Sequence, residues 1–406
     1  MTQVGQRRLH RRGEDEQASV STLELFFDLV FVFALTQVTA FMAQDIGARS
    51  VVQGVLIVVL LWWAWTGYAW LANVVSADET AIKVVMFAAM AAMFLLALCI
   101  PEAYDDGAGG LDGPLVLASC YLAFRVMHLV MFVVVARDDP GLRAQLARFA
   151  PSAFGSSIVL FVAATTEGAT QTWLWALALV VDYVGTALGG ASGWRLPAPG
   201  HFSERHGLII IVALGESIVA IGVGVAQLPI TWPIIAASLL GLFLVQALWW
   251  AYFDVSALLG EHALAHEPAA TRPRLARNAY SFAHLPLMVG IVLVALGLKK
   301  VLEYVADTEH HDLSDPLKGA ALAALVLGLA TYLVAHVLFK HLVSHELSTA
   351  RLVAAVVLLV AWVPLREVPA LGQLGVVLLV VVAALGTEAV VHRERRREIR
   401  SGLGRH

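Results

Sequence analysis

The chain has 406 residues, of which 59% are hydrophobic and only 14% are charged, and its mean hydropathy is +0.77. Soluble domains carry roughly 25% charged residues, so this composition excludes an ordinary soluble protein and predicts a polytopic membrane protein. The formal net charge of −4 is small and points to no class of partner, nucleic acid included.

The N-terminal stretch, residues 1–20, is polar and lacks the short apolar core of a cleavable signal peptide. The first apolar segment is therefore expected to remain in the membrane. Further apolar segments of about 16–25 residues follow, each long enough to cross a hydrocarbon layer of roughly 30 Å. We expect twelve membrane-spanning helices and an all-α fold, with spans at 24–43, 51–71, 81–100, 115–136, 151–166, 171–190, 205–227, 233–255, 277–298, 317–340, 350–365 and 371–391.

The basic residues predict the sidedness of the chain, because cytoplasmic loops are enriched in Lys and Arg. With twelve spans both tails face the cytoplasm, and most of the 27 basic residues then fall on that side. We expect an inner-membrane protein with both termini cytoplasmic, whose basic tails contact the anionic inner leaflet. The tails hold Arg7, Arg8, Arg11 and Arg12 before the first span and Arg393, Arg395, Arg396, Arg397, Arg400 and Arg405 after the last.

Short matches between distant spans indicate an internal repeat. Ala-Leu-Thr-Gln at 34–37 matches Ala-Leu-Gly-Glu at 213–216, and Trp-Trp-Ala-Trp at 62–65 matches Trp-Trp-Ala-Tyr at 249–252. In each case span n pairs with span n + 6. A unit with an even number of spans repeats in the same orientation, which predicts two halves related by an axis along the membrane normal.

The repeat divides the chain into two six-helix units and three connecting or terminal segments. We expect a cytoplasmic tail at 1–23, the first unit at 24–190, a cytoplasmic linker at 191–204, the second unit at 205–391 and a second tail at 392–406.

Polar groups inside membrane segments are costly, so each is a candidate functional residue. Glu216 is predicted near the middle of the seventh span, where it could pair with a cation, carry a proton or face water. The matching position in the first half is Gln37. Arg125 lies within the fourth span with His128 on the same helical face. Arg125 requires an acid, and either Glu216 or Asp182 could supply it.

A second polar group is predicted near the cytoplasmic ends of several spans. Glu24 and Asp28 lie four residues apart on one face of the first span. Histidine titrates near neutral pH, so this group could form a proton or cation entry site, or it could simply lie near the headgroups. It comprises Glu24, Asp28, Asp254, His284, His336 and Glu388. These residues lack metal-ligand spacing, and we expect neither a metal nor a cofactor.

Two stretches resemble the signatures of the bacterial low temperature requirement protein A family. They are Leu-Glu-Leu-Phe-Phe-Asp-Leu-Val-Phe-Val-Phe-Ala-Leu at 23–35 and Glu-Arg-His-Gly-Leu-Ile-Ile-Ile-Val-Ala-Leu-Gly-Glu-Ser at 204–217. Together with the multi-span pattern the resemblance covers roughly residues 18–395. It implies an integral membrane protein named for a growth requirement in the cold, with no settled biochemical activity.

The sequence favours a transporter or channel for a small solute or ion, with a path between the halves near spans 1, 4, 6 and 7. Asp28, Arg125 and Glu216 would line it. The alternative is a non-transporting assembly, lipid-interacting or cold-stress factor whose charges only bridge helices. We expect no enzyme, because no P-loop, Gly-x-Gly-x-x-Gly or Gly-x-Ser-x-Gly motif is present. The sequence is compatible with a homo-oligomer.

Overall fold

The computed structural model describes residues 19–76, 79–107, 109–226, 228–391 and 393–394, and their regular structure is helical. Within these ranges the expectation of an all-α fold is confirmed. The basic residues predicted to lie at the membrane surface in the tails fall almost entirely outside the described part of the chain.

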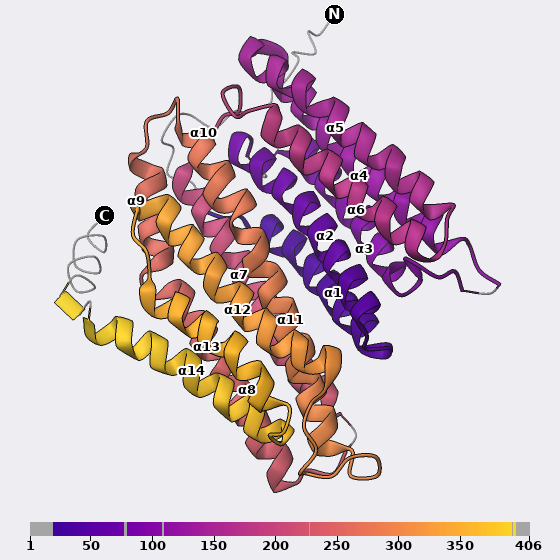
Figure 1. The fold of residues 1–406 in the computed structure, drawn as a ribbon. Coiled ribbons are helices and arrows are strands. Elements are labelled where there is room, and N and C mark those ends of the chain that lie inside the picture. Colours follow the sequence, from indigo (N-terminus) through magenta and orange to yellow (C-terminus); the bar gives the residue numbers. More distant parts are fainter. Residues whose placement is uncertain (1–18, 77–78, 108, 227, 392, 395–406) are drawn as a thin grey trace, which may run out of the picture.

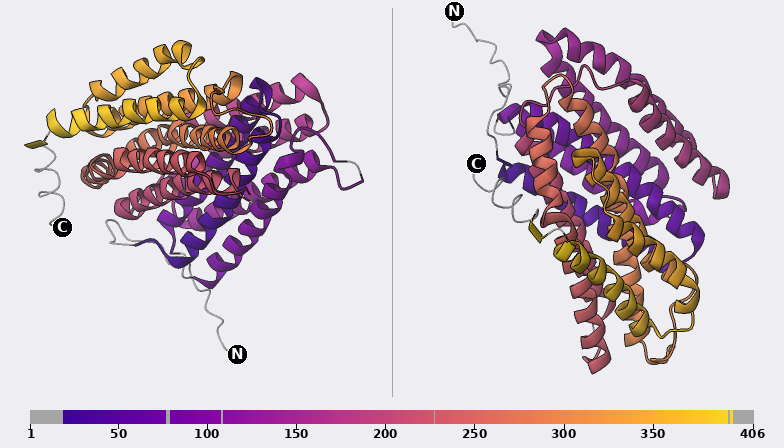
Figure 2. Two further views of the ribbon diagram at one scale, coloured as in Figure 1. Left: turned by 90° about the horizontal axis from the view of Figure 1, so that it is seen from below. Right: turned by 60° about the vertical axis from the view of Figure 1, so that its left-hand side comes forward.

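The helices form two groups that lie side by side, residues 22–188 on one side of the molecule and residues 199–391 on the other (Figure 1 and Figure 2). The first group consists of α1 (Thr22–Gln44), α2 (Ala48–Val74), α3 (Thr80–Leu98), α4 (Gly113–Val135), α5 (Pro140–Ala164) and α6 (Gly168–Leu188), with the short 3₁₀ turns η1 (Ile100–Glu102) and η2 (Ala136–Asp138). Helix α1 packs on α2 and α3, the chain continues through α3–α4, α4–α5 and α5–α6 contacts, and α6 returns to α2.

The second group repeats this order of neighbours. It consists of α7 (Pro199–Gly224), α8 (Trp232–Phe253), α9 (Ser256–His266), α10 (Arg272–Leu275), the π-helix η3 (Ala276–Phe282), α11 (His284–Ala306), α12 (Gly319–Ser344), α13 (Thr349–Leu365) and α14 (Ala370–Val391). Helix α7 packs on α8 and α11, contacts continue through α11–α12, α12–α13 and α13–α14, and α14 returns to α8.

Each of the twelve predicted spans overlaps a helix of the structure, although the ninth, 277–298, begins in η3 and stops eight residues before the end of α11. Ten of the described helical segments are long and apolar enough to cross a membrane, which makes the chain a multi-pass membrane protein by length and composition. The other two are α13, which has only 17 residues, and α6, whose first turn carries Thr170, Gln171 and Thr172. The number twelve therefore stays a prediction.

Two helices begin earlier than the apolar runs indicate. Helix α5 begins at Pro140, where Asp139 caps its first turn by accepting from the Leu142 amide at 3.0 Å. Helix α7 begins at Pro199, inside the predicted linker, because proline suits the first helical position. Because α7 starts earlier, Arg205 lies inside the helix with its side chain buried, and Glu216 lies past the middle of α7.

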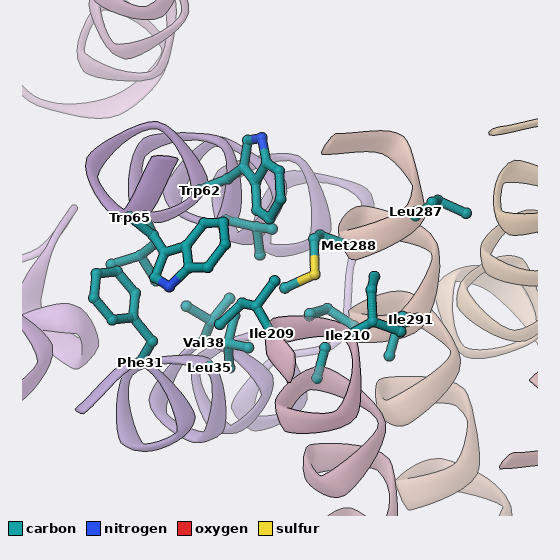
Figure 3. Packing of buried hydrophobic residues seen from close by; sticks show 14 of the residues in the cluster. Phe31, Leu35, Val38, Trp62, Trp65, Ile209, Ile210, Leu287, Met288 and Ile291 are labelled. Carbon is teal, nitrogen blue, oxygen red and sulfur yellow. The ribbon is translucent and has the colours of Figure 1, made fainter. Parts of the chain in front are cut away.

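The interior between the two groups is apolar and aromatic. Phe31 and Leu35 of α1 and Trp65 of α2 meet Ile209 of α7 and Met288 of α11 (Figure 3). Between helices in a bilayer, such contacts stabilise the fold by van der Waals packing rather than by removal of apolar surface from water. Contacts between α1 and α7 and between α2 and α11 join the two groups into one body.

The outer surface is also apolar, as expected for helices in contact with lipid. Large hydrophobic side chains are exposed along α5, α13 and α14. They include Ile158, Val162, Val353, Val356, Val360, Val363, Leu379 and Val382. An exposed apolar stripe of this length in water would promote aggregation, so the structure agrees with a bilayer environment.

Glycines on α11 face the backbone of α12 and allow the two helices to pack closely together. A Cβ atom added to Gly297 would lie 2.8 Å from the Cα atom of Leu325, and one added to Gly290 would lie 2.8 Å from the Tyr332 nitrogen. Small residues at such contacts permit van der Waals packing between backbones in the membrane.

Replacement of Gly297 by alanine is expected to push α11 and α12 apart and to lower the free energy of unfolding by about 1–3 kcal/mol. The measurement is the melting temperature of the purified protein in one detergent. The matched control is Gly386→Ala on α14, where a Cβ atom meets open space. Equal melting temperatures for the two variants would contradict the close α11–α12 contact.

Candidate functional site

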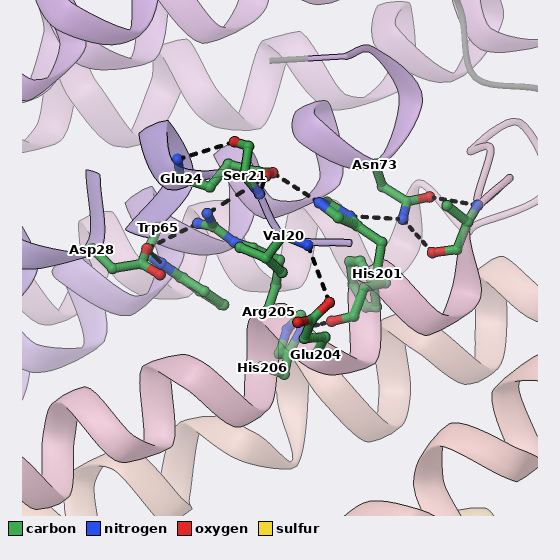
Figure 4. A network of polar contacts seen from close by, with 12 residues as sticks. Val20, Ser21, Glu24, Asp28, Trp65, Asn73, His201, Glu204, Arg205 and His206 are labelled. Carbon is green, nitrogen blue, oxygen red and sulfur yellow. Dashed lines mark hydrogen bonds and ion pairs between the residues drawn. The ribbon is translucent and has the colours of Figure 1, made fainter. Parts of the chain in front are cut away.

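A buried ion pair joins the two groups of helices near the start of α1. Arg205 on α7 donates from Nη2 to Oδ1 of Asp28 on α1 at 2.9 Å, and Trp65 on α2 donates from Nε1 to the same oxygen at 2.8 Å (Figure 4). The Arg205 guanidinium also lies over the Trp65 ring, 5.5 Å from its centroid. All three side chains are buried, so the ion pair and the Trp65 ring contact one another and are shielded from lipid.

A second pair lies beside the first. His201 Nε2 is 2.9 Å from Oε1 of Glu24, and Nη1 of Arg205 is 3.9 Å from the same oxygen. Glu24 also accepts from the Ser21 amide at 2.8 Å, which completes the cap of α1. One carboxylate therefore fixes the start of α1 and binds α7.

The start of α1, the end of α2 and the start of α7 meet on one face of the molecule, which we call the tail face. Asn73 at the end of α2 donates to the Ala198 carbonyl at 2.6 Å. The Val20 amide, just before α1, donates to Glu204 at 3.1 Å. Figure 4 shows these contacts around His201 and Arg205.

Glu216 makes a third polar contact between the groups, away from the tail face. Thr36 on α1 donates its hydroxyl hydrogen to Glu216 on α7. Gln37, the predicted repeat counterpart of Glu216, is the next residue of α1 and is half-buried. The two counterparts thus lie on facing helices, but Glu216 bonds to the neighbour of Gln37.

Arg125 pairs with Asp182, which decides between the two partners that the sequence allowed. Nη2 of Arg125 on α4 donates to both carboxylate oxygens of Asp182 on α6, at 2.9 and 3.1 Å. The guanidinium lies 5.2 Å from the centroid of the Phe149 ring on α5. Arg125 Nε has no hydrogen-bond partner among the described residues.

A cavity adjoins this pair. It is lined by residues of α2, α4, α5 and α6, of the loop after α6 and, from the second group, of η3, and its volume is about 40 Å³. That is room for a few waters, at roughly 10–15 Å³ each. Its lining comprises Trp63, Thr66, Gly67, Trp70, Arg125, His128, Phe132, Phe149, Thr186, Trp194, Arg277 and Ser281. We call it the first cavity.

Residues of the second group of helices line another cavity, which we call the second cavity. Its lining comprises Trp250, Asp254, Val255, Ser256, Lys340, Arg351, Leu385 and Glu388. Arg351 on α13 pairs with Glu388 on α14 at 2.9 Å. Arg351 also contacts His336 on α12. An arginine–carboxylate pair thus borders each cavity.

His284 lies in the interior and outside both cavity linings. Its Nε2 is 2.9 Å from the Tyr252 hydroxyl, and its ring stacks on Trp62 with 6.4 Å between centroids. The His206 ring contacts it edge-on at 5.5 Å. These contacts connect the two groups through aromatic rings.

The predicted path residues do not gather at one point. Arg125 and His128 line the first cavity with Asp182 directly behind, whereas Asp28 and Glu216 lie in two separate contacts of α1 with α7. The predicted cytoplasmic-side group divides likewise. Glu24 and Asp28 both lie beside Arg205, and His284 lies in the aromatic interior. His336 and Glu388 contact Arg351, and Asp254 lines the second cavity with Arg351. Within the described ranges, no three His, Cys, Asp or Glu side chains are placed to hold a metal ion.

The partners of these groups could not be identified from the sequence. By the predicted bounds, His201 lies in the cytoplasmic linker, and Arg205, Arg277 and Arg351 lie in the first two positions of three spans. In the structure His201, Arg205 and Arg351 are buried and bound to acids. A signal was present for Arg205, because the proline at 199 suits a helix start and would place Arg205 more than one turn inside the helix, where an arginine needs a buried partner.

Residues 19–386 match the family of the bacterial low temperature requirement A protein (LtrA). An uncharacterized protein of Rhizobium meliloti (strain 1021) is 28% identical over 297 residues, which cover 71% of this chain and 70% of that protein. The fold and the buried charges define a multi-pass helical membrane protein. The chain belongs to the LtrA family, as the two signatures predicted.

Replacement of Asp182 by asparagine is expected to destabilise the protein by about 3–5 kcal/mol, because Arg125 would keep its charge without a buried carboxylate. The melting temperature in detergent should fall clearly. The exposed Asp105→Asn variant removes the same charge from the surface and should melt within a degree or two of the parent. If Asp182→Asn melts like Asp105→Asn, the pair does not hold α4 to α6.

Proposed function

We propose that the protein is a transporter for a small solute, built from two parallel six-helix repeats that move relative to each other. The matched order of helix contacts in the two groups supports the repeats. The cavities also support them, because Trp63 and Trp250, which occupy matching places in the repeated motifs, each line one of them. Such repeats are common in secondary transporters, although a fold by itself assigns no function.

The observation that carries the proposal is the composition of the first cavity. Arg125, His128 and Thr186 come from the first repeat, whereas Arg277 and Ser281 come from the second. A polar cavity on the boundary of two repeats changes shape when the repeats move. A solute held there could be exposed to one side of the membrane and then to the other.

Polar bonds between the repeats would set the resting arrangement. They include Asp28–Arg205, Glu24–His201 and Thr36–Glu216 on α1 and α7. Trp62 and Trp70 of α2 donate to the carbonyl and hydroxyl of Ser281 at 2.7 and 3.0 Å. Directional bonds of this kind favour discrete arrangements over continuous deformation.

The proposal places the protein in the inner membrane with both termini, and therefore the tail face, in the cytoplasm. The basic tails would then contact the anionic inner leaflet. No catalytic step and no cofactor is assigned to the chain.

A second function, a non-transporting membrane factor, is favoured by one observation. Arg125, Arg205 and Arg351, the buried arginines of the three ion pairs, each have a carboxylate partner within the chain. Pairs of this kind can serve only to fix helix neighbours.

Glu216→Gln separates the two functions. The variant keeps an acceptor for Thr36 but removes the charge at the α1–α7 contact, so transport is expected to fall to the level of empty liposomes while folding persists. The measurement is ion, proton and solute flux across a panel in liposomes containing the purified protein.

The control is Glu309→Gln, which removes the same charge at an exposed position outside the helices. It should transport like the parent. Gel filtration and the melting temperature report folding of all three proteins. Full flux by a folded Glu216→Gln variant, or no flux by the parent for any solute, would contradict the proposed role.

A further inference from the structure

The first cavity has polar atoms without partners on several walls. Thr66 Oγ1, Arg125 Nε, His128 Nδ1 and Thr186 Oγ1 are buried and have no hydrogen-bond partner among the described residues. Each belongs to a residue that lines the cavity and is at least nine-tenths buried. Unsatisfied buried polar groups cost roughly 1–3 kcal/mol each, so a polar occupant at this place would be stabilised.

The charges around the cavity favour an anion. Asp182 offsets Arg125, while Arg277 has no carboxylate partner among the described residues. Arg277 bonds only to neutral oxygens, Asn278 Oδ1 at 3.0 and 3.1 Å and the Ala187 carbonyl at 3.4 Å. One arginine charge on the wall therefore remains uncompensated, and a planar guanidinium suits a carboxylate.

The remaining walls are aromatic. Trp194, in the loop between α6 and α7, packs on Trp70, Phe132 and Phe149 with ring centroids 5.9, 5.2 and 5.6 Å apart. Trp194 thereby forms part of the aromatic wall of the cavity. Walls of this kind suit a short apolar body attached to a charged group better than they suit a fully hydrated inorganic ion.

The backbone at Arg277 is unusual. Arg277 and Ser281 belong to η3, a π-helical segment at the start of α11. Such segments occur mostly as short insertions in α-helices and are frequent at functional sites. Here the π-helix belongs to the second repeat and supplies one wall of a cavity in the first.

We propose that the first cavity binds a small organic monocarboxylate, with Arg277 and Arg125 facing the carboxylate and the aromatic walls facing its apolar body. Thr66, Thr186 and His128 would supply the remaining hydrogen bonds. This proposal adds a ligand class to the transport function proposed above. It rests on that function only in taking the bound carboxylate to be the transported solute. Binding itself is measured without transport.

The test uses the full-length protein in detergent and propionate as the probe. Propionate is expected to raise the melting temperature and to change tryptophan fluorescence with saturation, since Trp63, Trp70 and Trp194 line the cavity. Propionamide has the same shape without the charge and should produce neither change. Both are compared in chloride at constant ionic strength.

Arg277→Gln is expected to weaken propionate binding about tenfold or more, as expected for a lost charge-assisted hydrogen bond. Arg274→Gln, an exposed arginine one turn earlier, is the matched control and should bind within about twofold of the parent. Thr186→Val, which removes only a hydroxyl, should weaken binding without affecting folding and provides a second variant.

Three results would overturn the proposal. They are no saturable response of the parent to propionate, an equal response to propionamide, or equal loss in Arg277→Gln and Arg274→Gln. The first would mean that water alone occupies the cavity, and the last that only the general surface charge attracts the anion. If propionate binds but no flux is measured, the transport function is overturned and the binding site stands. If other solutes are transported but propionate does not bind, the binding site is overturned and the transport function stands.

Discussion

The pairing of Arg205 with Asp28 is the interaction on which the arrangement of the two groups depends. An arginine cannot lose its charge in a protein, so a buried arginine on α7 requires a carboxylate close by. Asp28 supplies it from α1, and Trp65 of α2 binds the same carboxylate oxygen. Three helices from two groups are thereby fixed in one register.

The same constraint explains the rest of the polar interior. Each buried arginine pair lies where two or three helices meet: Arg125–Asp182 between α4 and α6, and Arg351–Glu388 between α13 and α14. A buried pair contributes little net stability but strongly disfavours arrangements that would separate it. The apolar packing around Trp65 supplies cohesion, and the charges specify which helices become neighbours.

The helical, multi-pass character of the chain was predictable from the sequence, because apolar length is a property of single segments. The partners were not, because they depend on contacts between distant segments. Asp28 was identified as costly, but its arginine was assigned to a helix start. Helix α7 actually begins at Pro199, and those extra residues bury Arg205. Arg125 was known to need an acid, yet only the packing of α4 beside α6 selects Asp182.

In the proposed function, the repeats move and expose the first cavity to each side of the membrane in turn. The most direct measurement is the reaction of Thr186→Cys, in a background where Cys99 and Cys120 are replaced by alanine, with a membrane-impermeant thiol reagent in oriented vesicles. If the repeats move in this way, the cysteine is expected to react from both faces of the membrane, and propionate is expected to slow the reaction on each. Reaction from the tail face alone, however long the exposure, would contradict this movement.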